Sequence, residues 1–256
     1  MRDLTYPPII AIAKTGFRAL GQTIAMSGTE RVPRTGGVLL ACNHVGYVDF
    51  VYGGLAANSS GRKIRFMAKR ELFDHTYVGP LMRSLHHIEV DRGEGNASFH
   101  TAVDYLRGGE AVGIFPEATI SRSMDIKTLK TGAVRIAAEA GVPLLPVVMW
   151  GTQRMMTKDH PRDFSRGKTI ALSVGPALHP TGADPVVETE ELRQALVALL
   201  DQTVAAYPAD EQPPGSWWVP VRLGGSAPTP EEADRLDAAE KRERAARRAA
   251  RKAETN

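Results

Sequence analysis

The chain has 256 residues, of which 43% are hydrophobic and 24% are charged, and its formal net charge is +3. This length and composition suit one sizeable buried core, and so modest a charge argues against a nucleic-acid partner. The single cysteine, Cys42, excludes an internal disulfide framework and is typical of a reducing compartment. No segment approaches the ~20 consecutive apolar residues of a membrane-spanning helix, and no signal peptide is evident. We therefore expect a cytoplasmic protein.

The first segment, which we assign to residues 1–29, carries apolar side chains at helical spacing. Lys14, Arg18 and Gln22 fall on the opposite side, so we predict one amphipathic helix over residues 8–26. Two interpretations remain open. The helix packs across the core of the domain, or it lies in a membrane interface with its apolar face in lipid.

Strand-like and helix-like segments alternate through residues 30–207. Strands are predicted at 37–42, 64–69, 86–90, 111–115, 143–150 and 169–175, and helices at 48–57, near Leu81, and at 97–106, 131–140 and 190–207. Such alternation with short connections predicts an α/β fold with a mostly parallel central sheet flanked by helices. The loops at one edge of that sheet are then expected to hold the chemistry.

The last part of the chain, residues 208–256, changes character. Its first 23 residues are rich in Pro and Gly and have no regular period, so we predict a wrapping segment or linker. Thr229, Pro230 and Glu232 then form a helix-start pattern of N-cap, proline at N1 and acid at N3.

The predicted C-terminal helix is strongly basic. Seven of the residues from 241 to 252 are Lys or Arg, and one is Glu. A helix of this kind is a solvated terminus, or it is attracted to anionic lipid by roughly 1 kcal/mol per basic residue near the surface.

The first candidate for chemistry lies where the apolar run Leu39–Cys42 ends. Asn43 and His44 follow the run, Gly46 permits a turn, and Asp49 stands at a helix start. Histidine has an ordinary pKa near neutral pH, and an adjacent carboxylate can hold its tautomer and stabilise the imidazolium. Five residues turn about 500° on a regular helix, so His44 and Asp49 can meet only if His44 precedes the helix.

Further polar side chains follow the other predicted strands. They are Lys69, Arg92, Glu117, Thr119, Lys127 and Lys130. If the strands are parallel, these loops share one face of the sheet with His44. A histidine base among cations suits an anionic substrate that carries a hydroxyl group. The remaining histidines show no spacing typical of metal ligands, and one cysteine argues against a zinc site.

Four blocks in fixed order resemble the motifs of the glycerolipid acyltransferases, the lysophosphatidic acid and glycerol-3-phosphate acyltransferase family. The blocks are Asn43–Asp49 (N-H-x4-D), Ile88–Arg92, Phe115–Ser121 and Val142–Pro146, and Lys130–Ala133 stands where the family often has K-x-G-A. The likeness covers about residues 30–180. The order of the blocks makes it specific, because the first motif alone would recur by chance.

This resemblance implies that His44 is the general base and Asp49 its orienting carboxylate. Arg92 and Lys69 would bind the phosphate of the acceptor, and Glu117 would lie in the acceptor pocket, where Thr119 and Lys130 are further candidates. The lipid hydroxyl itself would attack an acyl thioester.

The implied partners are an acyl donor, either acyl-CoA or acyl carrier protein, and a lysophospholipid acceptor, with lysophosphatidic acid the best single choice. No cofactor is implied. The implied location is the cytoplasmic face of a membrane, held peripherally on an anionic surface.

The sequence departs from the family pattern at two positions. Ala118 replaces the usual Gly and has less access to positive φ. Ile120 replaces the usual Arg and removes a cation from the phosphate site. Arg122 could substitute for it, although a two-residue offset can direct a side chain elsewhere. These two departures affect the predicted identity of the acceptor more than the predicted type of reaction.

Two other functions remain open at the level of sequence. The same His–Asp pair could activate water in a thioester or ester hydrolase, although no G-x-S-x-G nucleophile elbow is present. The protein could also be a non-catalytic lipid-surface adaptor that acts through its two terminal helices. Cys42, which ends an apolar strand, is interpreted as a core residue rather than a nucleophile.

Overall fold

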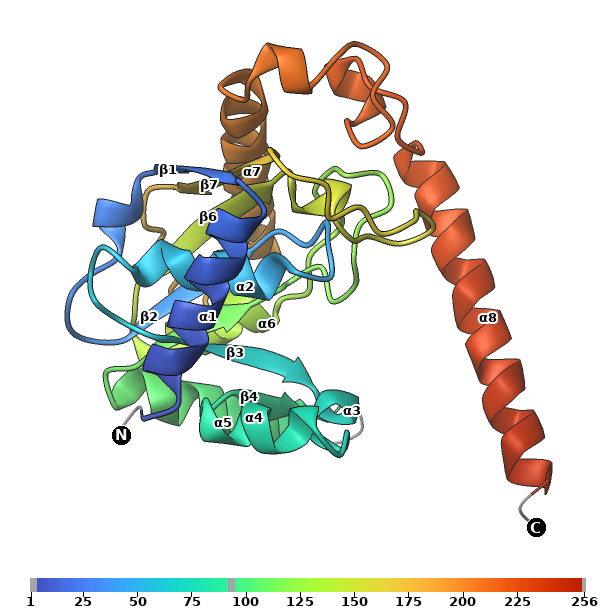
Figure 1. Ribbon diagram of the computed structural model, residues 1–256. Coiled ribbons are helices and arrows are strands. Elements are labelled where there is room, and N and C mark those ends of the chain that lie inside the picture. Colours follow the sequence, from blue (N-terminus) through green and yellow to red (C-terminus); the bar gives the residue numbers. More distant parts are fainter. Residues whose placement is uncertain (1–3, 92–94, 255–256) are drawn as a thin grey trace.

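The computed structural model describes residues 4–91 and 95–254 and shows an α/β fold around a seven-stranded sheet (Figure 1). The strand order is β1-β7-β6-β2-β5-β3-β4, and every neighbouring pair is parallel except β6 and β7. The prediction of a mostly parallel sheet flanked by helices is confirmed. The strands are β1 (Thr23–Ser27), β2 (Val38–Cys42), β3 (Ile64–Lys69), β4 (Ile88–Val90), β5 (Ala111–Ile114), β6 (Leu144–Trp150) and β7 (Thr169–Val174).

Helices cover both faces of the sheet. They are α1 (Tyr6–Ala19), α2 (Asp49–Gly53), α3 (Arg70–Phe73), α4 (Val78–Ser84), α5 (Gly95–Arg107), α6 (Gly132–Ala140), α7 (Pro185–Ala205) and α8 (Pro230–Glu254), with short 3-10 turns at 29–31, 54–57, 152–154, 209–211 and 221–223. None of the helices in these two described ranges is long and apolar enough to cross a membrane.

The central strand β2 explains how the core divides. All five of its residues are buried, because both faces of the sheet are covered and a buried parallel strand is apolar throughout. Leu39 packs in the cluster formed with α5, α6 and α7, whereas Leu40 and Cys42 pack in the cluster on the face covered by α1 and α2. The carboxyl end of β2 is therefore fixed from both sides.

The predicted helix over residues 8–26 is too long. Helix α1 ends at Ala19, Gly21 takes a positive φ of 58°, and Thr23–Ser27 forms the edge strand β1 beside β7. The left-handed glycine ends the helix, and the β-branched residues that follow suit a strand. The apolar residues keep a helical spacing across this junction, although the structure changes there from helix to strand.

Helix α1 combines features of both interpretations. Phe17 stacks on Tyr52 with ring centroids 4.8 Å apart, and the Tyr6 hydroxyl donates to the Ile64 carbonyl at 2.6 Å. Leu4 and Ile12 nevertheless remain 81% and 67% exposed. The helix is packed on the domain and still presents apolar side chains to its surroundings.

Smaller corrections concern the ends of elements. The strand predicted at 86–90 begins at Ile88, because His86 has a positive φ of 55° and the His87 ring accepts a hydrogen bond from the Phe66 amide. The helix predicted from 190 begins at Pro185, where the Asp184 side chain caps the first turn.

The segment before α8 packs on the domain. Trp218 and Val219 are buried, and the Trp150 indole donates to the Gln212 side chain at 3.0 Å. Thr229 and Glu232 then exchange backbone-to-side-chain hydrogen bonds of 2.9 and 3.2 Å at the start of α8. The predicted helix start is confirmed, and the C-terminal end of α8 extends away from the body of the protein (Figure 1).

Candidate active site

The His44 and Asp49 side chains meet at the carboxyl end of β2. His44 lies in the turn before α2, and its Nδ1 is 2.9 Å from Asp49 Oδ2, which meets the geometric condition set by the sequence. The His44 side chain is 22% exposed, and the Asp49 side chain is fully buried. A ring that donates through Nδ1 leaves Nε2 as the acceptor for a substrate proton.

Both oxygens of the Asp49 carboxylate accept hydrogen bonds. Oδ2 accepts the Val45 and Gly46 amides, both at 2.8 Å, and Oδ1 accepts the Thr152 hydroxyl at 2.5 Å. Main-chain donors in a closed turn are fixed in direction, so they set the carboxylate before any substrate arrives. Asp49 in turn fixes the orientation of the His44 ring.

The turn itself is fixed to β6. The side-chain amide of Asn43 donates to the backbone carbonyl of Met149 at 3.0 Å and accepts a hydrogen bond from the Met149 backbone N–H at 2.7 Å. The Asn43 side chain thus continues the β2–β6 pairing past the end of β2. A Cβ on Gly46 would lie 3.1 Å from the carbonyl oxygens of Thr152 and Met156. A larger residue at this position would require these carbonyl groups to shift by a few tenths of an ångström.

Glu117 joins the His44 turn to the loop that follows β5. Its carboxyl group accepts the His44 amide at 2.9 Å and the Lys127 amide at 3.2 Å, and only 5% of the residue is exposed. Burial raises the pKa of Glu117 to about 8, although the two amide donors and the charge of Lys127 act in the opposite direction. The Ser121 amide completes the junction with a 2.7 Å hydrogen bond to the His44 carbonyl.

The other predicted site residues are less closely gathered. Thr119 accepts the Lys127 ammonium at 3.1 Å, whereas Lys130 is exposed and contributes its backbone amide to the Pro116 carbonyl at 2.9 Å. Lys69 is exposed at the carboxyl end of β3, two strands away from β2. Arg92 lies outside the described residues.

The two departures from the family pattern have different structural outcomes. Ala118 has a φ of 61°, so the backbone keeps the left-handed conformation without glycine. Ile120 is buried, and Arg122 directs its guanidinium to the carboxylates of Asp159, Asp237 and Glu240. Arg122 is thus engaged with α8 in this structure.

Sequence reasoning missed Thr152, the hydroxyl that fixes the second oxygen of Asp49. Thr152 lies two residues beyond β6, and the carboxyl end of β6 shares its edge of the sheet with that of the parallel strand β2. The same edge rule that selected Lys69 and Glu117 could have found it. Cys42 is confirmed as a core residue, because burial raises the pKa of its thiol well above the ordinary range.

Comparison with known proteins identifies the family of this chain. The model of the Acyltransferase family matches residues 23–150, from the edge strand β1 to the end of β6. The chain belongs to this family. It is therefore an acyltransferase enzyme, which removes the interpretation as a non-catalytic adaptor.

Individual relatives of this acyltransferase are similar over most of the chain. The 1-acyl-sn-glycerol-3-phosphate acyltransferase of Bacillus subtilis (strain 168) is 33% identical over 176 residues, covering 68% of this chain and 83% of the relative. The Borreliella burgdorferi enzyme of the same name is 25% identical over 181 residues, with 68% and 69% covered. The crystal structure of the 1-acyl-sn-glycerophosphate (LPA) acyltransferase PlsC from Thermotoga maritima shares the fold, with a TM-score of 0.66, 22% identity and coverages of 79% and 80%.

Proposed function

We propose that this acyltransferase moves a fatty acyl group from acyl-CoA or acyl carrier protein to the free hydroxyl of lysophosphatidic acid, forming phosphatidic acid. The names of the relatives from Bacillus subtilis and Borreliella burgdorferi support this acceptor. The reaction is a step of phospholipid synthesis, and the thiol of the donor is its second product.

The observation that carries the proposal is the 2.9 Å contact between His44 Nδ1 and the fully buried Asp49 carboxylate. His44 Nε2 takes the proton of the acceptor hydroxyl as its oxygen bonds to the thioester carbonyl carbon. The carbon–sulfur bond then breaks, and the proton passes to the leaving thiolate. Asp49 stabilises the imidazolium between these two transfers.

Apolar side chains next to the His44 turn support a lipid substrate. Tyr47 and Phe50 are 45% and 48% exposed on the turn and on α2; elsewhere, Leu4 is exposed just before α1 and Ile12 within it. Exposed apolar side chains of this kind suit contact with acyl chains or a membrane interface. We include in the proposal a peripheral position on the anionic, cytoplasmic face of a membrane.

The test is acyl transfer by the His44→Ala variant, measured with acyl-CoA and a panel of lysophospholipids and glycerol 3-phosphate, with products identified by mass. We expect kcat to fall by about 10²–10⁴, the usual contribution of a general base. His100→Ala, an exposed position on α5, is the matched control and should keep full activity. Full activity of His44→Ala would refute the mechanism, and release of free fatty acid at a comparable rate without an acceptor would favour a hydrolase.

A further inference from the structure

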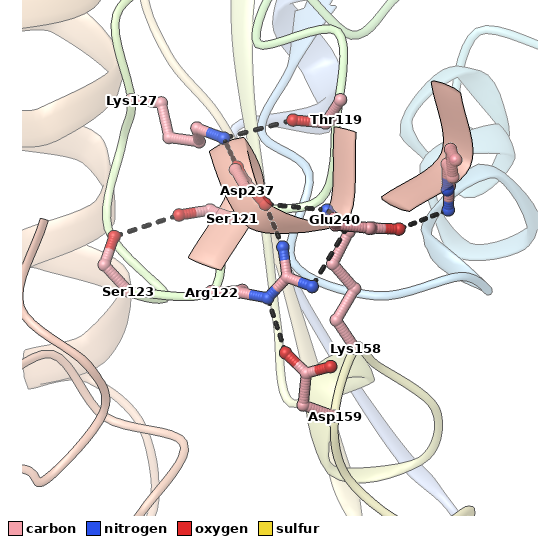
Figure 2. A network of polar contacts seen from close by, with 10 residues as sticks. Thr119, Ser121, Arg122, Ser123, Lys127, Lys158, Asp159, Asp237 and Glu240 are labelled. Carbon is pink, nitrogen blue, oxygen red and sulfur yellow. Dashed lines mark hydrogen bonds and ion pairs between the residues drawn. The ribbon is translucent and has the colours of Figure 1, made fainter. Parts of the chain in front are cut away.

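Helix α8 is attached to the catalytic domain through the carboxylates of Asp237 and Glu240, and Asp237 pairs with the larger number of the domain's cations. The Asp237 side chain contacts Arg122 and Lys127, and it accepts the Lys158 ammonium at 3.0 Å (Figure 2). These three cations come from the loop after β5 and from the loop that follows β6. One residue of the terminal helix therefore contacts cations from two separate loops of the domain.

The three cations are built into the domain rather than spread over its surface. The side chains of Arg122, Lys158 and Lys127 are only 7%, 10% and 16% exposed. Asp159 also binds Arg122 at 2.5 Å, and Glu240 binds Arg122 and Lys158 at 3.0 and 3.1 Å. Cations this sheltered require an anion nearby, because an uncompensated charge is costly to remove from water.

Helix α8 supplies that anion without a substantial apolar contact of its own. Ala233 is buried, but among the α8 side chains that the structure describes Asp237 and Glu240 are half-buried and the others after Ala233 are exposed, including Leu236 at 45%. The helix is therefore docked mainly by ion pairs. A different anion with a higher charge can replace such contacts with little loss of apolar burial.

A pocket beside this cluster connects it to the active-site turn. Its volume is about 370 Å³, and its lining includes Tyr47, Thr157, Arg122, Lys158 and Glu240. Tyr47 belongs to the turn that holds His44, and the Thr157 hydroxyl donates to the Val45 carbonyl at 2.6 Å. The cation cluster and Tyr47, three residues after His44, thus border the same pocket.

We propose that Arg122, Lys127 and Lys158 form a binding site for a phosphate monoester, and that Asp237 occupies this site as an internal anion until the phosphate displaces it. A phosphate dianion offers more acceptor oxygens than the Asp237 carboxylate to cations that come from two loops, and a guanidinium can bind two phosphate oxygens at once. Thr119, which already bonds Lys127, adds a hydroxyl at the edge of the site. Assignment of the phosphate to the lysophosphatidic acid acceptor rests on the proposed function, whereas phosphate binding itself does not.

The first experiment measures binding of inorganic phosphate to the full-length chain by calorimetry. Asp237→Asn removes the internal anion, and Asp234→Asn, which makes the same change at an exposed position one turn earlier, is the matched control. If Asp237 leaves the three cations in about one molecule in ten or fewer, the phosphate site is open in only that fraction. Asp237→Asn should then tighten phosphate binding about tenfold or more. Equal affinities in the two variants would overturn the proposal.

A second pair of variants keeps the test decisive if Asp237→Asn folds poorly. Glu240→Gln removes the neighbouring carboxylate and should also tighten phosphate binding, and Lys158→Gln should weaken it relative to the wild type. Thermal unfolding of each variant shows whether a change in affinity merely follows a loss of structure. Unchanged phosphate affinity in both of these folded variants would contradict the site.

The source of the phosphate is distinguished by steady-state kinetics. We expect Asp237→Asn to lower KM for lysophosphatidic acid about tenfold, by the same population argument, and to leave KM for acyl-CoA and for a monoacylglycerol acceptor unchanged. A lower KM for acyl-CoA alone would overturn the assignment to the acceptor. If no acyl transfer occurs but phosphate binding responds as stated, the proposed function fails and the phosphate site stands.

Discussion

Two aspartates of this protein are held in opposite ways. Asp49 is fully buried and receives two main-chain amides, a threonine hydroxyl and the His44 ring. The Asp237 side chain is 20% exposed and forms ion pairs with two lysines and an arginine. The first carboxylate is fixed by short, neutral donors that belong to the fold, and the second by long, charged side chains.

This difference separates a permanent site from an exchangeable one. Amides in a turn cannot move away without unfolding it, so the His44–Asp49 pair is organised in advance of the reaction. Ion pairs that reach solvent, as those of Asp237 do with its side chain 20% exposed, are weakened by salt and can be exchanged for another anion. In the mechanism that we propose, the domain thus combines a fixed base with a charged contact that a phosphate-bearing substrate replaces.

The largest expected effect is that of Asp49→Asn on turnover. An amide can keep the contacts to the main chain and to Thr152, but it cannot stabilise a charged imidazolium, so we expect kcat to fall by about 10²–10⁴. Thr152→Val, which removes one hydroxyl and keeps the carboxylate, should cost less. Steady-state kinetics on the three proteins give the comparison, and an Asp49→Asn variant with kcat within a factor of about three would remove Asp49 from the mechanism.

The next effect is the pH dependence of stability caused by Glu117. Its pKa of about 8 lies above the ordinary value of 4.5, so the folded protein keeps this proton after the unfolded chain has lost it. Its contribution to stability is therefore complete below pH 4.5 and is lost as the pH rises toward 8, by up to about 1.4 kcal/mol per pH unit.

Glu117→Gln should abolish that slope. Denaturant unfolding at a series of pH values gives the free energy of unfolding of both proteins, and the advantage of the wild type should shrink as the pH rises. Glu191→Gln on the exposed side of α7 is the matched control, expected to run parallel to the wild type through this window. Parallel curves for Glu117→Gln would show that the carboxyl group is not held protonated.

A smaller effect distinguishes the two aspartates directly. The Debye length falls from about 10 Å at 0.1 M salt to about 3 Å at 1 M, which weakens the pairs of Asp237 and hardly affects hydrogen bonds to neutral donors. Hydrogen exchange should therefore accelerate with NaCl for the amides of residues 233–240 and stay constant for Val45 and Gly46. Equal salt responses in the two regions would mean that α8 is not docked by charge.

The parts of the site that sequence could predict are those set by local geometry. His44 and Asp49 are five residues apart, and the number of residues per helical turn already required His44 to precede α2. The helix start at Thr229 and Glu232 depends on four consecutive residues and was predicted for the same reason. The alternation of elements was sufficient for the parallel sheet.

The parts that could not be predicted depend on contacts between distant segments. Strand β1 exists because Thr23–Ser27 pairs with β7, which is almost 150 residues away along the chain. Asp237 lies in a helix whose composition suggested a solvated end, and its role depends on where 208–229 directs that helix. The charge pattern of α8 does not determine where the preceding segment places this helix.

The smallest expected effect concerns Ala118, where the sequence departs from the family glycine and the backbone does not. At a φ of 61° an alanine costs about 1–2 kcal/mol relative to its preferred conformations, and glycine avoids this cost but loses about 0.4–1 kcal/mol through the greater freedom of the unfolded chain. Ala118 is exposed, so Ala118→Gly should raise the free energy of unfolding by roughly 0.5–1 kcal/mol, which thermal or denaturant unfolding can resolve. Ala195→Gly in the middle of α7 should have the opposite sign. A destabilised Ala118→Gly variant would show that the Ala118 methyl group contributes contacts that outweigh the backbone strain.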